Sequence, residues 1–418
     1  QIEQESACSI LYRQETAGMS HIIFHIDVNS AYLSWTAVEQ LKNGADVDIR
    51  TIPAIIGGDR ESRHGIVLAK SPSAKKFGIR TGEPVVNAFR KCPNLHMDPP
   101  NHRMYREYSR RLMDFLKTYT PEIEQVSVDE CYMDFTGIAQ RFSSPVEAAY
   151  EIKARVYEKF GFTVNVGIST NKLLAKMASD FTKPDRVHTL FKEEIPTKMW
   201  SLPISELFML GRKTVPKLYN MRIRTIGELA KTDKELLIKK FGKFGKMMWE
   251  YANGIDNSEV NYKIEKPKSI GNSVTLPIDI SDIEQLGKVL VALVEQVSHR
   301  LRKEELIANV VNVQLRTSNF ENKTHQRKLN EATSNTKDIF RMAKELLEEM
   351  YTNGIAIRLV GMRVDGLIEK NEKQLSLFNS KDTEKQENLD KVVDELKQKF
   401  GYNSITRAGK LHSEKEIK

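Results

Sequence analysis

The chain has 418 residues, of which 40% are hydrophobic and 29% charged, with a formal net charge of +8. This length predicts several domains. No apolar stretch reaches the roughly 18–20 residues that a membrane-spanning helix needs, so we expect no such helix. The positive charge favours a polyanionic partner, with a solvated lysine surface as the alternative. The cysteines (Cys8, Cys92 and Cys131) are scattered without metal-ligand spacing, which predicts a reducing cytoplasm and argues against a disulfide scaffold or a zinc site.

The first part of the chain predicts alternating strands and helices after a leader. Residues 1–18 show no periodicity, and we expect them to be disordered. An apolar run at 22–28 predicts a strand, and the helical spacing of Trp35, Val38 and Leu41 predicts a helix that starts near Ser30. The further expected elements are strands at 52–56 and 66–68, a short helix ending at Gly78, a helix over 104–119, a strand carrying Asp129 and Glu130, a helix over 146–160, a strand over 163–168 and a helix over 171–179. This order predicts an α+β core with an insertion at about 45–98.

Three carboxylates follow apolar runs of strand type. Asp27 follows Ile22 to Ile26, and Asp129 and Glu130 follow the run at 123–128. A charge that leaves an apolar strand is costly to desolvate unless a partner neutralises it, and a divalent cation can neutralise several acids at once. Mg²⁺ prefers hard oxygen ligands, and two such ions about 3.5–4 Å apart promote phosphoryl transfer. The alternative is that the acid pair begins a turn and that Asp27 caps a helix.

The second half of the chain predicts a helical basic segment followed by a separate α/β domain. Residues 187–258 are mostly helical and basic. Within them, 208–229 resemble a helix–hairpin–helix with Met209 in place of its first glycine; an ordinary helical turn is the alternative. The later domain predicts strands at 270–276 and 355–364, helices at 283–303 and 337–351, and two alternating strands between the helices. On those strands Asn312, Gln314 and Arg316, with Gln326 and Lys328, would form one polar face that either follows a phosphate backbone or faces solvent. A charged helix is expected at 389–400.

Taken together, these motifs resemble the Y-family of translesion DNA polymerases, of DinB/UmuC type, over about 20–378. The resemblance implies an α+β multidomain, right-hand-like polymerase: a palm with a mixed sheet and helices, small fingers, a helical thumb with a helix–hairpin–helix, and an α/β little finger. The implied boundaries are a leader at 1–18, palm at 19–44 and 99–186, fingers at 45–98, thumb at 187–258, linker at 259–268, little finger at 269–368 and a C-terminal tail at 369–418.

The resemblance also implies an activity and its site residues. The activity is low-fidelity, template-directed addition of dNTPs to a primer 3′-hydroxyl during DNA damage tolerance. Two Mg²⁺ ions are expected at Asp27, Asp129, Glu130 and the Val28 carbonyl. Tyr32, five residues after Asp27, matches the steric gate that rejects a 2′-hydroxyl. Expected nucleotide ligands are Lys75, Lys183 and Ser71, and the expected contacts to the nascent base pair are Gly65, Ile66 and Leu68.

The fingers turn departs from the DinB branch. Ala69, Pro72 and Lys75 stand where that branch has Thr, Tyr and Arg. Ala69, Lys75 and a basic residue at 70 look more like the UmuC branch, as does the run Asp27-Val-Asn-Ser. Because lysine is a point charge rather than a bidentate fork, the triphosphate contacts from this side differ from those of the DinB branch.

The expected partners are primer–template DNA, dNTPs and the bacterial sliding clamp, bound by a cytoplasmic monomer that does not associate with a membrane. The alternatives are a nonenzymatic, UmuC-like DNA- or clamp-binding factor and a two-metal nuclease. The expected DNA-binding residues are Gly211, Arg212, Lys213, Arg316 and Lys328; the expected clamp-binding residues are Gln374, Leu375, Leu377 and Phe378.

Overall fold

The computed structural model describes residues 21–59, 65–263, 266–370, 381–401 and 404–405. The predicted leader at 1–18 and the predicted clamp peptide at 374–378 lie outside the described residues. The chain divides into two units, Gln1–Ile264 and Glu265–Lys418, and each is described by itself. Among the helices of the described ranges, none combines the length and apolar character needed to cross a bilayer.

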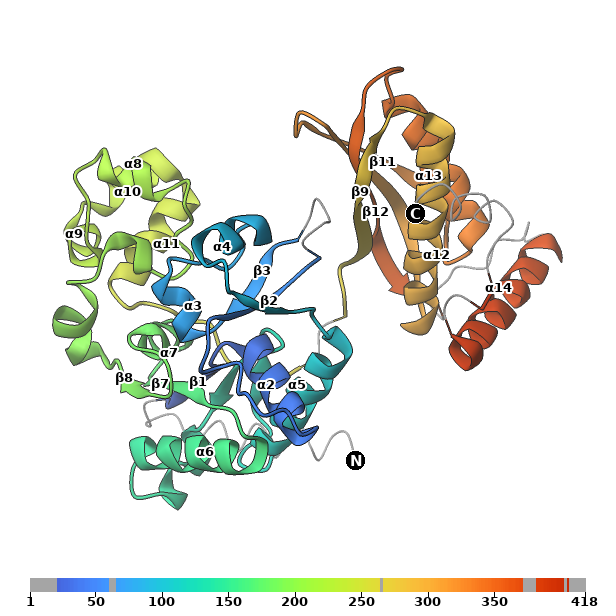
Figure 1. Ribbon diagram of the computed structural model, residues 1–418. Coiled ribbons are helices and arrows are strands. Elements are labelled where there is room, and N and C mark those ends of the chain that lie inside the picture. The colour runs from blue at the N-terminus through green and yellow to red at the C-terminus, as the bar shows by residue number, and fades with distance from the viewer. Residues whose placement is uncertain (1–20, 60–64, 264–265, 371–380, 402–403, 406–418) are drawn as a thin grey trace, which may run out of the picture. The chain divides into compact units, whose positions relative to one another are not determined.

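A five-stranded sheet forms the centre of the first unit (Figure 1). Its order is β5 (Ile123–Gln125), β6 (Glu130–Asp134), β1 (Ile23–Val28), β7 (Val164–Ser169) and β8 (Val187–Thr189). Strand β1 runs antiparallel to both β6 and β7, whereas β8 runs parallel to β7. The sheet therefore continues past residue 186, where the sequence predicted that the palm would end.

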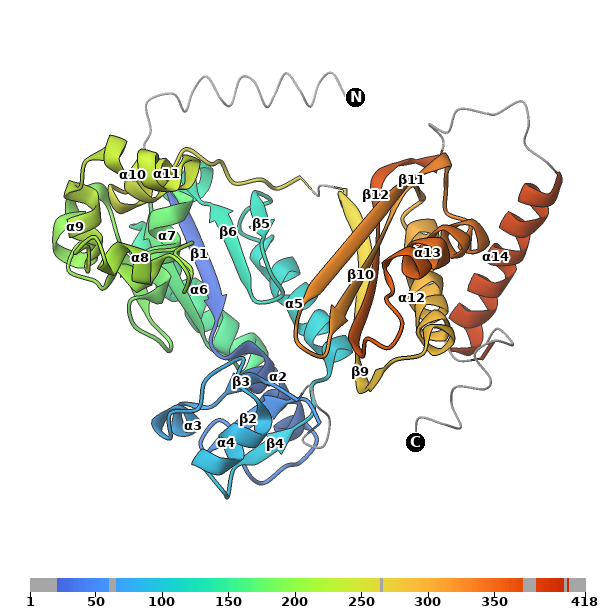
Figure 2. The same cartoon turned by 90° about the horizontal axis from the view of Figure 1, so that it is seen from above.

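Helices cover the two faces of this sheet differently (Figures 1 and 2). Phe24, Ile26 and Val28 of β1 pack into the core formed with α2 (Ala31–Lys42), α5 (His102–Leu116) and α6 (Pro145–Phe160). The alternate residue Ile23 packs instead beside Ala175 of α7 (Lys172–Asp180) on the other face. Because side chains alternate along a strand, Asp27 lies on the α7 face, close to the end of β1.

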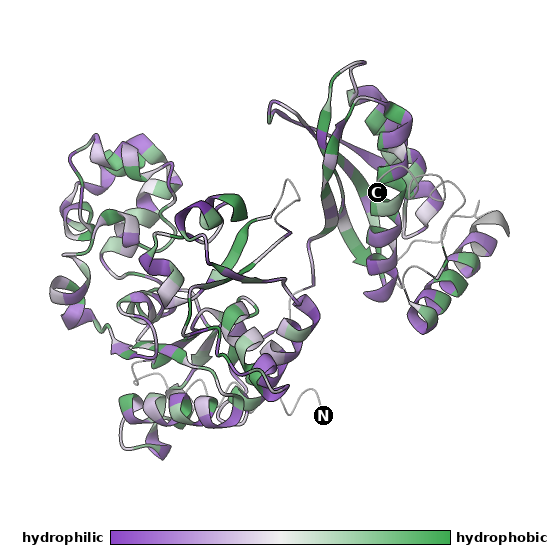
Figure 3. Cartoon of the chain, viewed as in Figure 1, coloured by the Kyte–Doolittle hydropathy of each residue, from purple (hydrophilic) through white to green (hydrophobic). Residues whose placement is uncertain are grey.

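The expected insertion is a small α/β layer. Its sheet has the order β3 (Val67–Lys70), β2 (Ala54–Gly57) and β4 (His96–Asp98), with α3 (Pro72–Lys76) and α4 (Val85–Lys91) beside it. Apolar residues of both helices and of β2 and β3 form a separate core, and Figure 3 colours β2 and β3 as largely hydrophobic. At Gly65 a Cβ atom would lie 2.2 Å from the Asp59 carbonyl oxygen, so glycine is needed for this close approach.

The basic segment is helical, as predicted. It contains η2 (Lys192–Glu194), the π-helical turn η3 (Ile195–Met199), η4 (Ile204–Glu206), α8 (Val215–Tyr219), α9 (Ile226–Lys231), α10 (Lys234–Phe241) and α11 (Lys243–Ala252); another 3-10 turn, η1 (Thr136–Arg141), follows β6. The hydrophobic core of the basic segment includes Leu173, Leu174 and Met177 of α7, so the palm and this segment share α7. Met209, at the expected hairpin glycine, has a φ of 69°, a conformation that glycine adopts more readily.

The second unit contains a four-stranded antiparallel sheet and, among its described residues, three helices. The strand order is β11 (Asn322–Thr333), β10 (Leu306–Thr317), β12 (Ile357–Glu369) and β9 (Ser269–Ile280), and α12 (Ile283–Lys303) and α13 (Thr336–Met350) pack on the sheet through one shared core. The C-terminal helix α14 (Lys381–Phe400) is longer than predicted, and Arg302 of α12 binds its Asp394 at 2.6 Å.

Candidate active site

Antiparallel pairing of β1 with β6 places two of the predicted carboxylates side by side. Asp27 and Glu130 are direct partners in the strand register, and the Val28 amide donates to the Asp129 carbonyl at 3.0 Å. We expected the run at 123–128 to be one strand ending at these acids, but this was wrong. Strand β5 stops at Gln125, a turn follows, and Glu130 begins β6. The acids meet because the end of one antiparallel strand lies beside the start of its neighbour.

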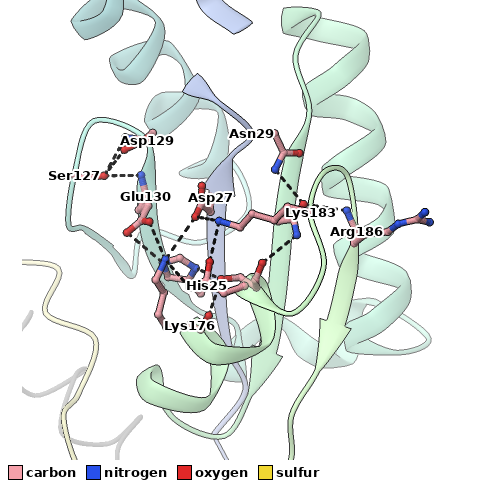
Figure 4. Close-up of polar contacts among 12 residues, drawn as sticks. His25, Asp27, Asn29, Ser127, Asp129, Glu130, Lys176, Lys183 and Arg186 are labelled. Carbon is pink, nitrogen blue, oxygen red and sulfur yellow. Dashed lines mark hydrogen bonds and ion pairs between the residues drawn. The ribbon is translucent and has the colours of Figure 1, made fainter. Parts of the chain in front are cut away.

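Two lysines neutralise this pair of acids (Figure 4). Lys183 Nζ lies 2.5 Å from Asp27 Oδ2, and Lys176 Nζ lies 2.8 Å from Glu130 Oε1 and 3.5 Å from Asp27 Oδ2. Asp180 contacts both ammonium groups, at 3.4 Å from Lys176 and 2.8 Å from Lys183. The side chains of Lys176 and Asp27 are only 9% and 8% exposed, so these contacts are poorly screened by water.

Burial and charge act in opposite directions on the pKa values of the two acids. Burial raises the pKa of Asp27 to about 6 in spite of Lys183 and Lys176. The pKa of Glu130 is instead lowered by its neighbours His25 and Lys176. We assign most of this lowering to Lys176, because His25 Nε2 is 3.8 Å from Glu130 and burial lowers the pKa of His25, which favours neutral imidazole. A cation near Asp27 would favour its ionised form.

The fit of this site to a divalent cation depends on its donor atoms. Within residues 21–59, 65–263, 266–370 and the other described parts, no three or more His, Cys, Asp or Glu side chains are already grouped as a metal site. The Asp129 carboxylate accepts a hydrogen bond from Ser127 Oγ at 2.6 Å rather than joining Glu130. Asp27 and Glu130 nevertheless present carboxylate oxygens from adjacent strands, beside Val28 and Asp129. The residues therefore fit a hard divalent cation in donor type and location.

Tyr32, the predicted steric gate, is the second residue of α2, the helix that follows Asp27. Its ring stacks on Tyr105 of α5, with 4.4 Å between centroids and 12° between planes. Thr36 donates to the Tyr32 carbonyl at 2.7 Å and also contacts the Tyr105 hydroxyl at 3.0 Å. Burial raises the pKa of Tyr32, and Asp129 and Tyr105 add to this effect, so the phenol is neutral at neutral pH. The stacking on Tyr105 thus fixes the position of the Tyr32 ring.

A cavity of about 420 Å³ connects the carboxylates to the insertion. It brings together the predicted Asp27, Val28, Tyr32, Asp129, Lys183, Leu68, Ser71 and Lys75, whereas Glu130, Gly65 and Ile66 do not line it. The other lining residues are Asn29, Ser30, Ala31, Ala69, Lys70, Pro72, Thr81 and Pro184.

The prediction that Ser71 binds nucleotide needs correction. Its side chain is fully buried, donates to the Ile52 carbonyl at 2.7 Å and accepts from the amides of Ala54 and Ala74 at 3.1 and 3.0 Å. A hydroxyl has one donor and two acceptor positions, and all are used. The Ser71 hydroxyl therefore caps α3 and joins it to β2, leaving no capacity for a phosphate.

Four positioning residues were not predicted from the sequence. Lys176 and His25 lie beneath the acids, and His25 Nδ1 contacts Ser179 Oγ at 2.8 Å. Asn29 donates to Asn165 at 3.0 Å and accepts from the Asp185 amide at 2.8 Å, while Asn165 donates to the Thr182 carbonyl at 2.7 Å. These two asparagines thus fix the loop that carries Lys183. The only available signal was the position of Asn29 two residues after Asp27.

Replacing Lys176 with methionine should weaken the sheet locally. Removing one partner of a buried pair leaves an uncompensated charge, so we expect the local free energy of unfolding to fall by about 3 kcal/mol. Hydrogen exchange of the β1 and β6 amides measures this quantity directly. The control is Lys246→Met, which removes a surface pair 57% exposed at the lysine and should change exchange by less than about 0.5 kcal/mol. Equal exchange in both variants would contradict a supporting role for Lys176.

The predicted DNA-binding residues lie outside this cavity. Gly211, Arg212 and Lys213 are exposed in the turn before α8, and their amides make no hydrogen bond to any described residue. In the second unit, the register pairs Arg316 with Asn322 and Asn312 with Gln326, with Lys328 opposite Val310. The predicted polar sheet face is therefore present on β10 and β11.

The fold is that of the Y-family DNA polymerases. A solved chain entitled "Y-family DNA polymerase chimera Dbh-Dpo4(243-245)-Dbh" superposes with a TM-score of 0.73 over 83% of this chain and 99% of its own length. Its sequence identity is 23%, so this likeness speaks for the fold. The fold class predicted from the sequence is confirmed.

The sequence comparisons define the family. The impB/mucB/samB family matches residues 26–180, and its C-terminal domain matches residues 267–377. A protein of Clostridium acetobutylicum named DNA polymerase IV is 49% identical over 95% of this chain and 100% of its own length. DNA polymerase IV 1 of Bacillus subtilis is 36% identical over 95% of each chain. The chain belongs to the impB/mucB/samB family.

Proposed function

We propose that the protein is a template-directed DNA polymerase of low fidelity that extends primers across damaged templates in the bacterial cytoplasm. The observation that carries the proposal is the direct pairing of Asp27 with Glu130, beside a cavity that Tyr32 and Lys183 also line. The family and the names of the relatives support the same activity. The alternative of a nonenzymatic DNA- or clamp-binding factor has no support among these relatives.

The cofactor in this proposal is a pair of Mg²⁺ ions. Asp27, Asp129, Glu130 and the Val28 carbonyl would hold them, since these groups supply oxygen ligands at one edge of the sheet. When bound, such ions neutralise phosphate charge and activate a hydroxyl for in-line phosphoryl transfer.

The protein's own residues then position the substrate. The Lys183 ammonium lies 2.5 Å from Asp27 and borders the cavity, where it would bind the triphosphate of the nucleotide. Lys176 remains beneath Glu130 and keeps its carboxylate oriented. The Tyr32 ring, fixed against Tyr105, occupies the space that a ribose 2′-hydroxyl would need. Lys75 and Leu68 face the same cavity from the insertion and would contact the phosphates and the base pair.

DNA would be held by surfaces outside the cavity. The exposed amides of 211–213 next to Arg212 and Lys213 suit a DNA phosphate, and Arg316 and Lys328 suit a second stretch of backbone. We assign domains as predicted, with the palm sheet extended to include β8. In this proposal the chain acts as a monomer and binds the sliding clamp through the peptide of residues 374–378.

Replacing Leu377 and Phe378 together with alanine should leave basal synthesis unchanged and reduce clamp-stimulated synthesis at least about tenfold, since buried apolar anchors dominate such docking. Primer extension with and without the clamp measures both quantities. The control is Asn379→Ala and Ser380→Ala, just beyond the peptide. Undiminished stimulation of the Leu377 and Phe378 double variant would remove the peptide from clamp binding.

Extension of a primer by the purified chain tests the activity itself. Undamaged and abasic templates with Mg²⁺ distinguish a polymerase from the alternatives, because a nuclease would shorten the primer and a binding factor would leave it unchanged.

A further inference from the structure

Lys70 of β3 is a second cation on the insertion side of the cavity and has no role so far. It lines the cavity together with Lys75, Thr81 and Lys183. It lies on the same strand face as Leu68, because the burial of β3 alternates from Val67 to Lys70. Its ammonium donates to Thr81 Oγ1 at 3.1 Å, which holds the flexible side chain toward the turn that borders the cavity.

Lys70 and Lys75 form no ion pair with any residue that the structure describes. Over the described ranges, neither ammonium has a carboxylate within 4.0 Å, whereas Lys91 of the same layer binds Glu83 at 2.6 Å. Lys70 is half-buried, and burial together with the charge of Lys75 lowers its pKa, while the charge of Glu83 acts in the opposite direction. Two cations that face one cavity and repel each other create a positive potential that an anion would relieve. Asp27 and Tyr32 line the same cavity, so under the proposed function the anion would be the phosphate chain of a nucleotide.

We propose that Lys70 is a further nucleotide-binding residue, which with Lys75 forms a two-lysine clamp on the triphosphate of the incoming nucleotide. This inference rests on the proposed function for the identity of the ligand. Two separate ammonium groups would replace the single guanidinium that the DinB branch has at the position of Lys75, and Thr81 would hold the Lys70 ammonium in place.

The test compares Lys70→Met with Lys76→Met, which removes an exposed lysine of α3 that does not line the cavity. Loss of one charge-assisted contact should raise the KM for dNTP about tenfold in Lys70→Met, with kcat nearly unchanged and the Kd for primer–template DNA unchanged. Lys76→Met should behave like the parent, and Lys70→Arg should recover most of the affinity. An unchanged KM for Lys70→Met, or a weaker Kd for DNA in its place, would overturn the assignment.

A direct binding measurement separates this inference from the proposed function. Calorimetric titration of the full chain with inorganic tripolyphosphate requires no turnover, and the affinity should fall about tenfold in Lys70→Met. If the parent extends no primer but binds tripolyphosphate about tenfold more tightly than Lys70→Met does, the proposed function fails and the two-lysine clamp stands. If the parent extends primers and binds tripolyphosphate no more tightly than Lys70→Met does, the two-lysine clamp fails and the proposed function stands.

Discussion

Replacing Asp27 with asparagine should reduce nucleotide addition by roughly a thousandfold. The variant would lose the carboxylate charge that is proposed to hold the cations that neutralise the phosphates. The geometry makes this side chain hard to replace. Asp27 is buried, is paired with Glu130 across the two central strands and contacts both Lys183 and Lys176. Single-turnover primer extension with saturating dNTP measures the loss.

The matched control for this variant is Asp134→Asn, at the opposite end of the same strand pair, where Asp134 lies opposite Ile23. It should retain nearly full activity. Binding of primer–template DNA should persist in both variants, since DNA contacts lie outside the cavity. Unfolded Asp27→Asn protein would favour a structural role for the acid pair, and near-normal extension would remove Asp27 from catalysis.

Replacing Tyr32 with alanine should increase ribonucleotide insertion relative to deoxyribonucleotide insertion by about a hundredfold, because the 2′-hydroxyl would no longer meet the ring. The stacking partner Tyr105 remains in the variant and cannot fill the space, since it is held by Thr36. The ratio of kcat/KM for rNTP and dNTP on one template measures the effect.

Tyr32→Phe is the control for this second experiment. It keeps the ring and the stack on Tyr105 while removing a hydroxyl for which no hydrogen bond is found in the part of the chain that the structure describes. It should therefore discriminate like the parent. Unchanged sugar selection in Tyr32→Ala would show that another residue forms the gate.

The strand and helix pattern of the first unit could be predicted because its residues alternate cleanly. Phe24, Ile26 and Val28 face the helical core while Asp27 faces α7, and this period of two is visible in the sequence. The turn between β5 and β6 was missed because apolar Val126 and Val128 continue the strand pattern, although Val126 is 47% exposed. The pattern of apolar residues alone could not distinguish an apolar turn from an apolar strand.

The site residues that sequence reasoning missed depend on pairings between distant segments. Lys176 lies 46 residues from Glu130 in the chain, and its role follows only from the packing of α7 on the sheet. The assignment of Ser71 to nucleotide binding was wrong for a related reason. Its three hydrogen bonds, to Ile52, Ala54 and Ala74, form only once β2 and α3 are in place. Local sequence cannot reveal whether a hydroxyl is already satisfied.

The most direct test of the central claim is primer extension by the purified full-length chain on undamaged and abasic templates with Mg²⁺. The paired carboxylates at the end of β1 and the start of β6 predict addition of dNTPs on both templates, and loss of that addition on both in Asp27→Asn. A parent protein that binds primer–template DNA yet adds no nucleotide to either template would contradict it.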